Sequence, residues 1–184
     1  MVSTDEPVES PKNDVTRVDP LTRPPDLGPA IGAAADEIER ARRITEPLLD
    51  DLRTARLFRM LYPRSVGEDE VEPATYIEAL VWADGSVGWC VSIANSIGLF
   101  APYLDLEPAR MVFGGPRAAC AWGPPNDCRG IAVPGGYRVT GRWDFGSGCR
   151  HAIWMGAHST SSNPTAQCAS TMPAARRCGR GSFR

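Results

Sequence analysis

The stretch that decides the fold runs from Gly135 to Trp154 and reads GGYRVTGRWDFGSGCRHAIW. It opens on a glycine turn, and small or apolar residues then alternate with polar ones from Tyr137 to Arg142, which is the period of a half-buried strand. Glycines within or between strands mark bulges or close approaches to the backbone, and here two of them flank Ser147. A flat ligand would need such access, and Trp122 and Trp143, predicted on neighbouring strands, could both face it. The residues alone nevertheless favour a small sheet with aromatic cross-strand pairs.

Upstream of this hairpin the pattern is helical. Apolar positions recur at helical spacing from residue 31 to 41, and the third predicted helix would bury Ile77, Leu80 and Val81. The fourth predicted helix is apolar on nearly all sides and is therefore expected at the centre of its domain. The expected helices are residues 30–42, 45–55 with Thr45 as cap, 73–83, 87–99 with Ser86 as cap, and 108–113.

The pattern changes at Gly114 to short strands, expected at 117–122, 131–133, 137–143 and 150–158, with residues 123–130 as a loop. The fold class is α+β, a helical domain followed by the start of an antiparallel β-domain. Residues 159–184 contain no Val, Ile or Leu, so they lack the residues of a core. The expected domains are a disordered lead-in at 1–29, the helical domain at 30–115, a partial β-domain at 116–158 and an unstructured tail at 159–184.

Composition narrows the functional classes. The net charge of −2 gives no reason to expect nucleic acid or an anionic membrane as partner. The longest apolar run, residues 87–100, is interrupted by polar residues and is too short to span a bilayer. The N-terminus lacks an export pattern, so a cytoplasmic location without disulfides is expected.

No catalytic or metal site is predicted from the residues alone. Cys149 and His151, with Cys120 and Cys128, are the one candidate metal set, but zinc sites usually have closer pairs, and buried cysteine is favoured. Asp84 is interpreted as part of a helix-breaking turn rather than as a catalytic carboxylate. No Ser-His-Asp arrangement and no phosphate-binding glycine motif is present.

Three segments together resemble a known family. They are LFRMLYPRSVG at 57–67, ALVWADGSVGWCVSIA at 79–94 and GGYRVTGRWDFGSGCRHAIWMGA at 135–157. In this order and spacing they resemble the acyl-CoA dehydrogenase superfamily, and within it the two-component flavin-dependent monooxygenases that hydroxylate phenols, aromatic acids and steroid rings. The resemblance covers about residues 30–158, and it favours a ligand-binding role for the hairpin.

The resemblance implies a helical domain, a β-domain and a C-terminal four-helix bundle in a homotetramer, with the flavin between the β-domain and the bundle. It implies reduced FMN or FAD as cofactor, a separate flavin reductase as partner and a small aromatic or steroid-like molecule as substrate. Ser147 would approach the reactive edge of the flavin. The implied cofactor-binding residues are Trp122, Trp143, Phe145, Ser147 and Gly148, and the implied substrate-binding residues are Trp89 and Ile93.

The sequence departs from the family after His158, where the expected further strands and helical bundle do not follow. We therefore expect a truncated or frameshifted member with weak or absent flavin binding and no assigned catalytic residue, so that its standing as an active enzyme stays open. One alternative is an acyl-CoA dehydrogenase, although WDFGSG in place of the W-I-T pattern usual in those enzymes favours the monooxygenase. The other is a non-catalytic remnant, or a fragment that pairs with intact subunits.

Overall fold

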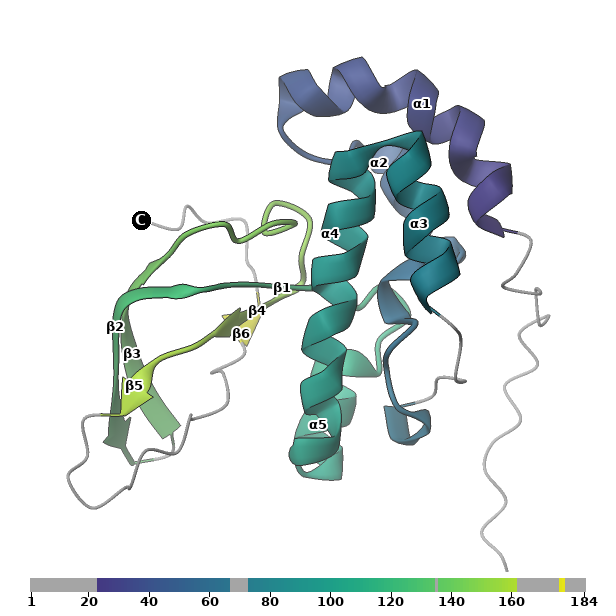
Figure 1. The fold of residues 1–184 in the computed structure, drawn as a ribbon. Helices are drawn as coiled ribbons and strands as arrows, with labels where there is room; N and C mark the ends of the chain where they lie inside the picture. The colour runs from purple at the N-terminus through teal and green to yellow at the C-terminus, as the bar shows by residue number, and fades with distance from the viewer. Residues whose placement is uncertain (1–22, 67–72, 135, 162–175, 178–184) are drawn as a thin grey trace, which may run out of the picture.

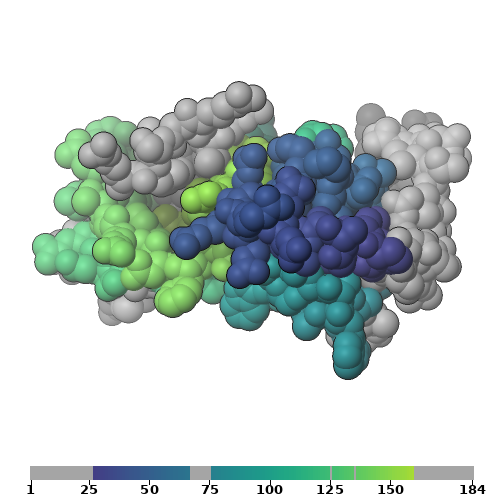
Figure 2. All heavy atoms as spheres, turned by 90° about the horizontal axis from the view of Figure 1, so that it is seen from above, coloured from purple at the N-terminus to yellow at the C-terminus, as the bar shows by residue number. Residues whose placement is uncertain are grey.

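The computed structural model describes residues 23–66, 73–134, 136–161 and 176–177. The helices lie together in one part of the molecule, and the strands extend to one side of them (Figure 1). Seen from above, the N-terminal helices and the strands lie side by side (Figure 2). The helical elements are α1 (Arg23–Ala41), α2 (Glu46–Thr54), η2 (Leu57–Arg59), η3 (Arg64–Val66), α3 (Pro73–Ala83), α4 (Gly85–Ser96), η4 (Ile97–Tyr103) and α5 (Leu106–Phe113).

Helix α1 begins at Arg23, seven residues before the predicted start. Two prolines follow Arg23 directly, in the first turn, where a missing backbone N–H costs nothing. Most of the predicted lead-in, residues 1–22, lies outside the described residues. In α2 the backbone of Thr45 takes the predicted cap position, but its side chain makes no capping hydrogen bond. The Thr45 side chain is buried instead, and the backbone carbonyl of Thr45 accepts the hydrogen bond from Leu49 N.

Helix α3 has the predicted bounds, and Leu80 is fully buried, but Val81 is 49% exposed. Helix α4 begins at Gly85, and its cap is Asp84 rather than the predicted Ser86. The Asp84 carboxylate accepts from the backbone N–H groups of residues 86 and 87, both at 2.9 Å. A carboxylate at this position satisfies two of the free amides of the first turn. The α-helical geometry of α4 ends at Ser96, and η4 continues the chain.

Helix α4 is central, as its all-round apolar pattern predicted, because it contacts α3, β1, η2 and η4 (Figure 1). Gly88 makes the α3 contact possible, since a Cβ there would lie 2.8 Å from the backbone nitrogen of Val81. Asn95 is fully buried and ties α4 to the segment after α2. Its Nδ2 donates to Leu57 O at 2.7 Å and to Val91 O at 2.9 Å, and its Oδ1 accepts from Leu61 N at 3.2 Å.

The core has two neighbouring parts within the described residues. The larger part is built from α1, α2, α3 and α4, with side chains such as Ile31, Leu52 and Leu80 at 0% exposure. The smaller part lies between η4, α5 and the start of β1, where the rings of Tyr62 and Phe113 meet edge to face with centroids 5.0 Å apart. Strand β1 therefore closes the helical core as well as beginning the sheet.

Within the described ranges, six strands form two three-stranded sheets, in the orders β1-β4-β6 and β3-β2-β5. The predicted hairpin is confirmed as the antiparallel pair β2–β3, but β2 extends through residues 125–130, which were predicted as a loop. A bulge between Asn126 and Arg129 interrupts this pair, with Asp127 at φ 52°. The strands are β1 (Cys120–Gly123), β2 (Pro125–Val133), β3 (Gly136–Trp143), β4 (Trp154–Ala157), β5 (Thr160–Ser161) and β6 (Arg176–Arg177).

Two features of the sheets differ from the sequence expectation. Strands β1 and β4 pair in parallel, with Cys120 opposite Trp154, whereas the sequence predicted an antiparallel arrangement throughout. Strands β5 and β6 lie within the stretch expected to be unstructured, where β5 pairs with β2 and β6 with β4. Backbone hydrogen bonding needs no apolar side chains, so composition could not reveal these two-residue strands.

Candidate functional site

One face of α4 meets the β part of the molecule. Trp89, Ile93 and Ser96 are spaced i, i+4 and i+7, which places them on one side of a helix. We call these three residues the α4 wall. Trp89 Nε1 donates to Ser147 Oγ at 3.0 Å, and Ser96 Oγ accepts from Trp122 Nε1 at 2.8 Å. The structure thus brings together four of the predicted site residues. Trp89 and Ile93 lie on α4, and Trp122 and Ser147 lie in the part of the molecule that holds the strands.

Ser147 lies in a tightly folded segment, residues 144–152, which we call the Ser147 turn. Phe145 and Gly148 both have positive φ, 53° and 80°. An L-residue in this region costs about 1–2 kcal/mol, which explains a glycine at 148. The amides of residues 151 and 152 both donate to Gly148 O, at 3.0 and 2.9 Å. The turn packs on β1 at Gly123, where a Cβ would lie 3.2 Å from Gly146 N and still closer to Asp144 O.

The Ser147 hydroxyl retains capacity to donate a hydrogen bond. Its oxygen accepts from the Trp89 indole, while its own contact to Phe145 O is 3.4 Å long. Hydroxyl donors usually lie 2.5–3.0 Å from the acceptor, so this contact is weak. A hydroxyl has one hydrogen to donate and two lone pairs. The hydrogen can therefore be directed to an acceptor on a bound molecule while the indole fixes the oxygen.

The prediction that Trp122 and Trp143 lie on neighbouring strands is wrong. Trp122 is in β1, and Trp143 ends β3 in the other sheet, opposite Pro125. They meet instead at His158, whose ring lies 5.0 Å from the Trp122 ring and whose carbonyl accepts from Trp143 Nε1 at 2.9 Å. His158 was not singled out from the sequence, because its role depends on the return of the chain after β4.

Two aromatic side chains at the Ser147 turn are exposed. Phe145 is 85% exposed, and Trp89, which bonds to Ser147, is 57% exposed. Phe145, predicted to bind the cofactor, is therefore the most open of the predicted site residues. The other members of the set, Trp122, Trp143, Ser147 and Gly148, are half-buried.

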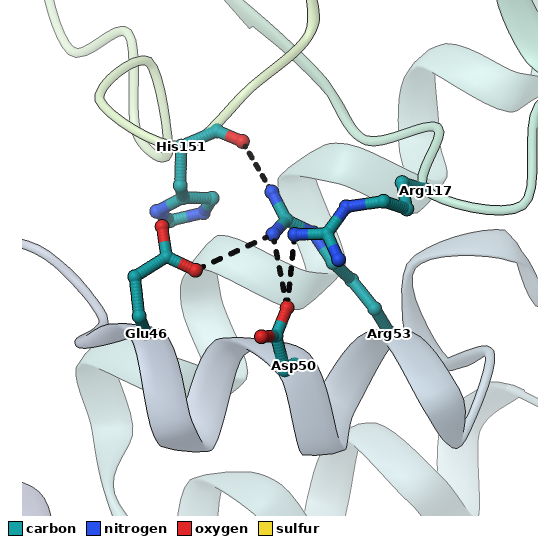
Figure 3. A network of polar contacts seen from close by, with 5 residues as sticks. All are labelled: Glu46, Asp50, Arg53, Arg117 and His151. Carbon is teal, nitrogen blue, oxygen red and sulfur yellow. Dashed lines mark hydrogen bonds and ion pairs between the residues drawn. The ribbon is translucent and has the colours of Figure 1, made fainter.

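A charged network links α2 to His151 in the Ser147 turn (Figure 3). Arg53 Nη2 donates to His151 O at 3.1 Å, and its Nη1 lies 3.7 Å from Glu46 and 3.5 Å from Asp50. Arg117 also pairs with Asp50, at 2.9 Å. Burial, and then the positive charge of Arg53, lower the pKa of His151 to about 4. Sequence reasoning missed this network because α2 and the turn are far apart in the chain.

Cys90 and Cys120 are free thiols, and burial raises the pKa of Cys120 to about 11. Within the described ranges, no group of three or more His, Cys, Asp or Glu side chains is placed to hold a metal ion. Of the helices in those ranges, none has the length and apolar character needed to cross a bilayer.

Comparison with known proteins gives a consistent group of relatives. No protein-family model matches the chain. It is 31% identical over 134 residues to the oxygenase subunit HsaA of a flavin-dependent monooxygenase from Mycobacterium tuberculosis, a match that covers 70% of this chain and 34% of that protein. It is 32% identical over 144 residues to the indole-3-acetate monooxygenase of Pseudomonas putida, covering 70% and 36%. The chain thus spans about a third of the length of these relatives.

Solved structures agree with these relatives. The crystal structure of HsaA from M. tuberculosis matches with a TM-score of 0.70 at 29% identity, over 77% of this chain and 38% of that one. XiaF from Streptomyces, solved with FADH2 and glycerol, matches with a TM-score of 0.69 at 26% identity, over 78% and 38%.

Proposed function

Over the residues that these comparisons cover, the chain belongs to the flavin-dependent monooxygenase oxygenase subunits that have the acyl-CoA dehydrogenase fold, and we propose that it supplies one wall of a flavin site. The enzyme would hydroxylate a small aromatic substrate with O2 and reduced flavin. The observation that carries this proposal is the hydrogen bond from Trp89 to Ser147, which fixes a hydroxyl whose own hydrogen makes only a long contact, 3.4 Å to Phe145 O.

The residues fit a flavin chemically. Reduced flavin, when bound, supplies the electrons that activate O2. Ser147 would donate its hydroxyl hydrogen to a polar atom at the edge of the ring, since only a 3.4 Å contact occupies that hydrogen in the structure. Trp122 would line the ring, with Trp143 held next to it through the His158 carbonyl. Gly148 keeps the backbone of the turn free of a side chain, and Phe145 would cover the open side.

The substrate would lie along the α4 wall, against Trp89 and Ile93. An indole ring and a branched aliphatic side chain offer apolar contact area to an aromatic molecule and exclude water from the reacting atoms. Relatives named for aromatic substrates, indole-3-acetate and resorcinol among them, favour this class over the acyl-CoA thioesters of the dehydrogenase alternative. A cytoplasmic location, a separate flavin reductase and assembly as a homotetramer complete the proposal.

A titration with reduced flavin tests the proposed site. The purified chain is titrated anaerobically with reduced FMN and reduced FAD, together with the variants Ser147→Ala and Ser92→Ala. Ser92 is the matched control, because it lies on α4 outside the α4 wall. We expect saturable but weak binding that Ser147→Ala weakens about tenfold, the equivalent of about 1.4 kcal/mol for one hydrogen bond, and that Ser92→Ala leaves unchanged.

The absence of saturable flavin binding, or an enoyl product, would contradict the proposal. No saturable binding up to about 1 mM flavin, an affinity of only about −4 kcal/mol, would favour the non-catalytic remnant. With a flavin reductase and NADH supplied, a hydroxylated product from a panel of phenols and indole acids supports the monooxygenase. An enoyl product from acyl-CoA substrates would instead identify a dehydrogenase.

A further inference from the structure

Side chains from different helices bond to the Ser147 turn. Trp89 on α4 donates to the Ser147 hydroxyl. Arg53 on α2 donates to His151 O at 3.1 Å. Further along, Arg150 Nη1 reaches back to Ala41 O at 3.2 Å. The turn therefore bonds to α4, to α2 and to the end of α1, and its position depends on these contacts.

Arg53 is held where it can serve as a fixed donor. Its side chain is only 10% exposed, and Asp50 and Glu46, one and two helical turns away on α2, both lie near Nη1 (Figure 3). Nη2 is left for the carbonyl of His151. A guanidinium can serve both purposes because its donors are arranged in a rigid planar fork. A lysine ammonium has three donors at a single point and cannot reach these separate acceptors in the same way.

The ring of His151 packs against the Ser147 turn at Gly148. A Cβ at Gly148 would lie 3.1 Å from His151 Nε2, so ring and glycine are in close contact. The ring also packs on Phe58, with centroids 5.9 Å apart. Its Nδ1 is buried and has no hydrogen-bond partner among the described residues. The ring thus serves as a packing element, and burial together with the Arg53 charge keeps it neutral, since the pKa is lowered to about 4.

We propose that Arg53 and His151 are positioning residues that hold the Ser147 turn, and with it the Ser147 hydroxyl, against the α4 wall. Arg53 fixes the backbone of the turn at His151, and the imidazole fills the space under Gly148. Both act through Ser147 and neither needs to touch flavin or substrate. This inference rests on the proposed flavin site and identifies the residues on which its geometry depends.

Hydrogen exchange measured by mass spectrometry tests the structural half of this inference without flavin. We compare the full chain with Arg53→Ala, Arg53→Lys and the control Arg40→Ala. Arg40 is exposed, and its guanidinium bonds only to a carbonyl of its own helix. In Arg53→Ala we expect amide exchange in the Ser147 turn to rise about tenfold, as one hydrogen bond to a charged donor is lost, while exchange in α4 stays unchanged. Arg53→Lys should be intermediate, and Arg40→Ala should match the parent chain.

An NMR titration gives a readout that general destabilisation does not move. The chain has two histidines, so His158 serves as an internal reference for His151. Replacing Arg53 by Ala removes the positive charge beside the ring, and the pKa of His151 should rise from about 4 towards its ordinary 6.5. Burial still lowers the pKa in the variant, so the rise should be partial.

Wild-type exchange of the Ser147 turn in a folded Arg53→Ala protein would overturn the inference, and so would an equal rise in the turn and in α4. If that variant does not fold, Arg53→Lys decides in the same way, because it keeps the charge beside Glu46 and Asp50. The flavin titration is then repeated with the same variants, and binding should weaken about tenfold in Arg53→Ala. If exchange in the turn rises in Arg53→Ala but the parent chain binds no flavin, the proposed function is contradicted and the positioning role of Arg53 is not.

Discussion

Replacing the buried Asn95 by Asp should make the stability of the chain depend steeply on pH. The amide of Asn95 donates to two carbonyl oxygens, those of Leu57 and Val91, and its oxygen accepts from Leu61 N. The variant Asn95→Asp keeps the shape and the acceptor but places a carboxylate oxygen against both carbonyls. A buried charge without a partner costs about 3–5 kcal/mol, so the aspartate will take up a proton where it can.

The direction of the pH effect follows from linkage. Burial and the two carbonyls raise the pKa of the new carboxyl in the folded state above its value of about 3.9 in the unfolded chain. The folded variant therefore binds the proton more tightly, and it loses stability relative to the parent as the pH rises from about 3.9 through the folded pKa. The loss is about 1.4 kcal/mol for each pH unit, so the destabilisation should be about 2–3 kcal/mol larger at pH 7 than at pH 5.

Urea unfolding followed by helical circular dichroism at pH 5 and pH 7 measures this difference. Subtracting the parent chain at each pH removes the titration of all shared groups. Ala33→Asp is the control, because it adds the same side chain at an exposed position on α1 and should show no comparable pH dependence. An Asn95→Asp variant that is equally destabilised at both pH values would refute the reasoning that Asn95 is buried with its amide facing carbonyls.

Three further changes probe other contacts. Asp84→Ala removes the cap that accepts two amides of α4 and should cost about 1 kcal/mol, seen as a fall of a few degrees in Tm. Gly148→Ala forces an L-residue to φ 80° beside His151 and should cost about 1–2 kcal/mol, whereas Gly85→Ala, with open space around it, should be far milder in the same thermal melt. Because the folded pKa of His151 lies near 4, its contribution to stability is fully present above pH 6.5 and falls as the pH drops from there through about 4. A His151→Gln variant should lose that slope in urea titrations.

Local signals predicted much of the fold. Pro73 marks the start of α3, and the alternation from Tyr137 to Arg142 predicted β3 correctly, because each depends on residues within one turn or one strand. The change from helical spacing to short strands at Gly114 predicted the order of helices and sheet, and the family resemblance agreed with that order. The cap of α4 was misassigned because Ser86 and Asp84 are both good caps by residue type, and only the backbone geometry decides which oxygen reaches the free amides.

Features that depend on distant contacts could not be read from the sequence. Residue 81 was predicted to be buried by helical spacing, but Gly88 brings α4 against the backbone of α3 at this point and leaves the Val81 side chain half exposed. Trp89, Ile93 and Ser147 were named through the resemblance, and their spatial relation needed the fold. Arg53 was missed because a surface-type residue on an amphipathic helix gives no sign that its guanidinium will bond to a carbonyl in the β part.

The parallel pairing of β1 with β4 has a consequence for the order of events on the ribosome. Strand β1 leaves the ribosome before β2 and β3, yet its hydrogen-bonded neighbour follows both of them. The β2–β3 hairpin is local and can close at once, whereas β1 must wait with an open edge while the helical core beneath it is already packed. A nascent chain from which β4 has not yet left the ribosome therefore has β1 without its hydrogen-bonded neighbour, and an unpaired strand edge is the part of a sheet most prone to aggregation.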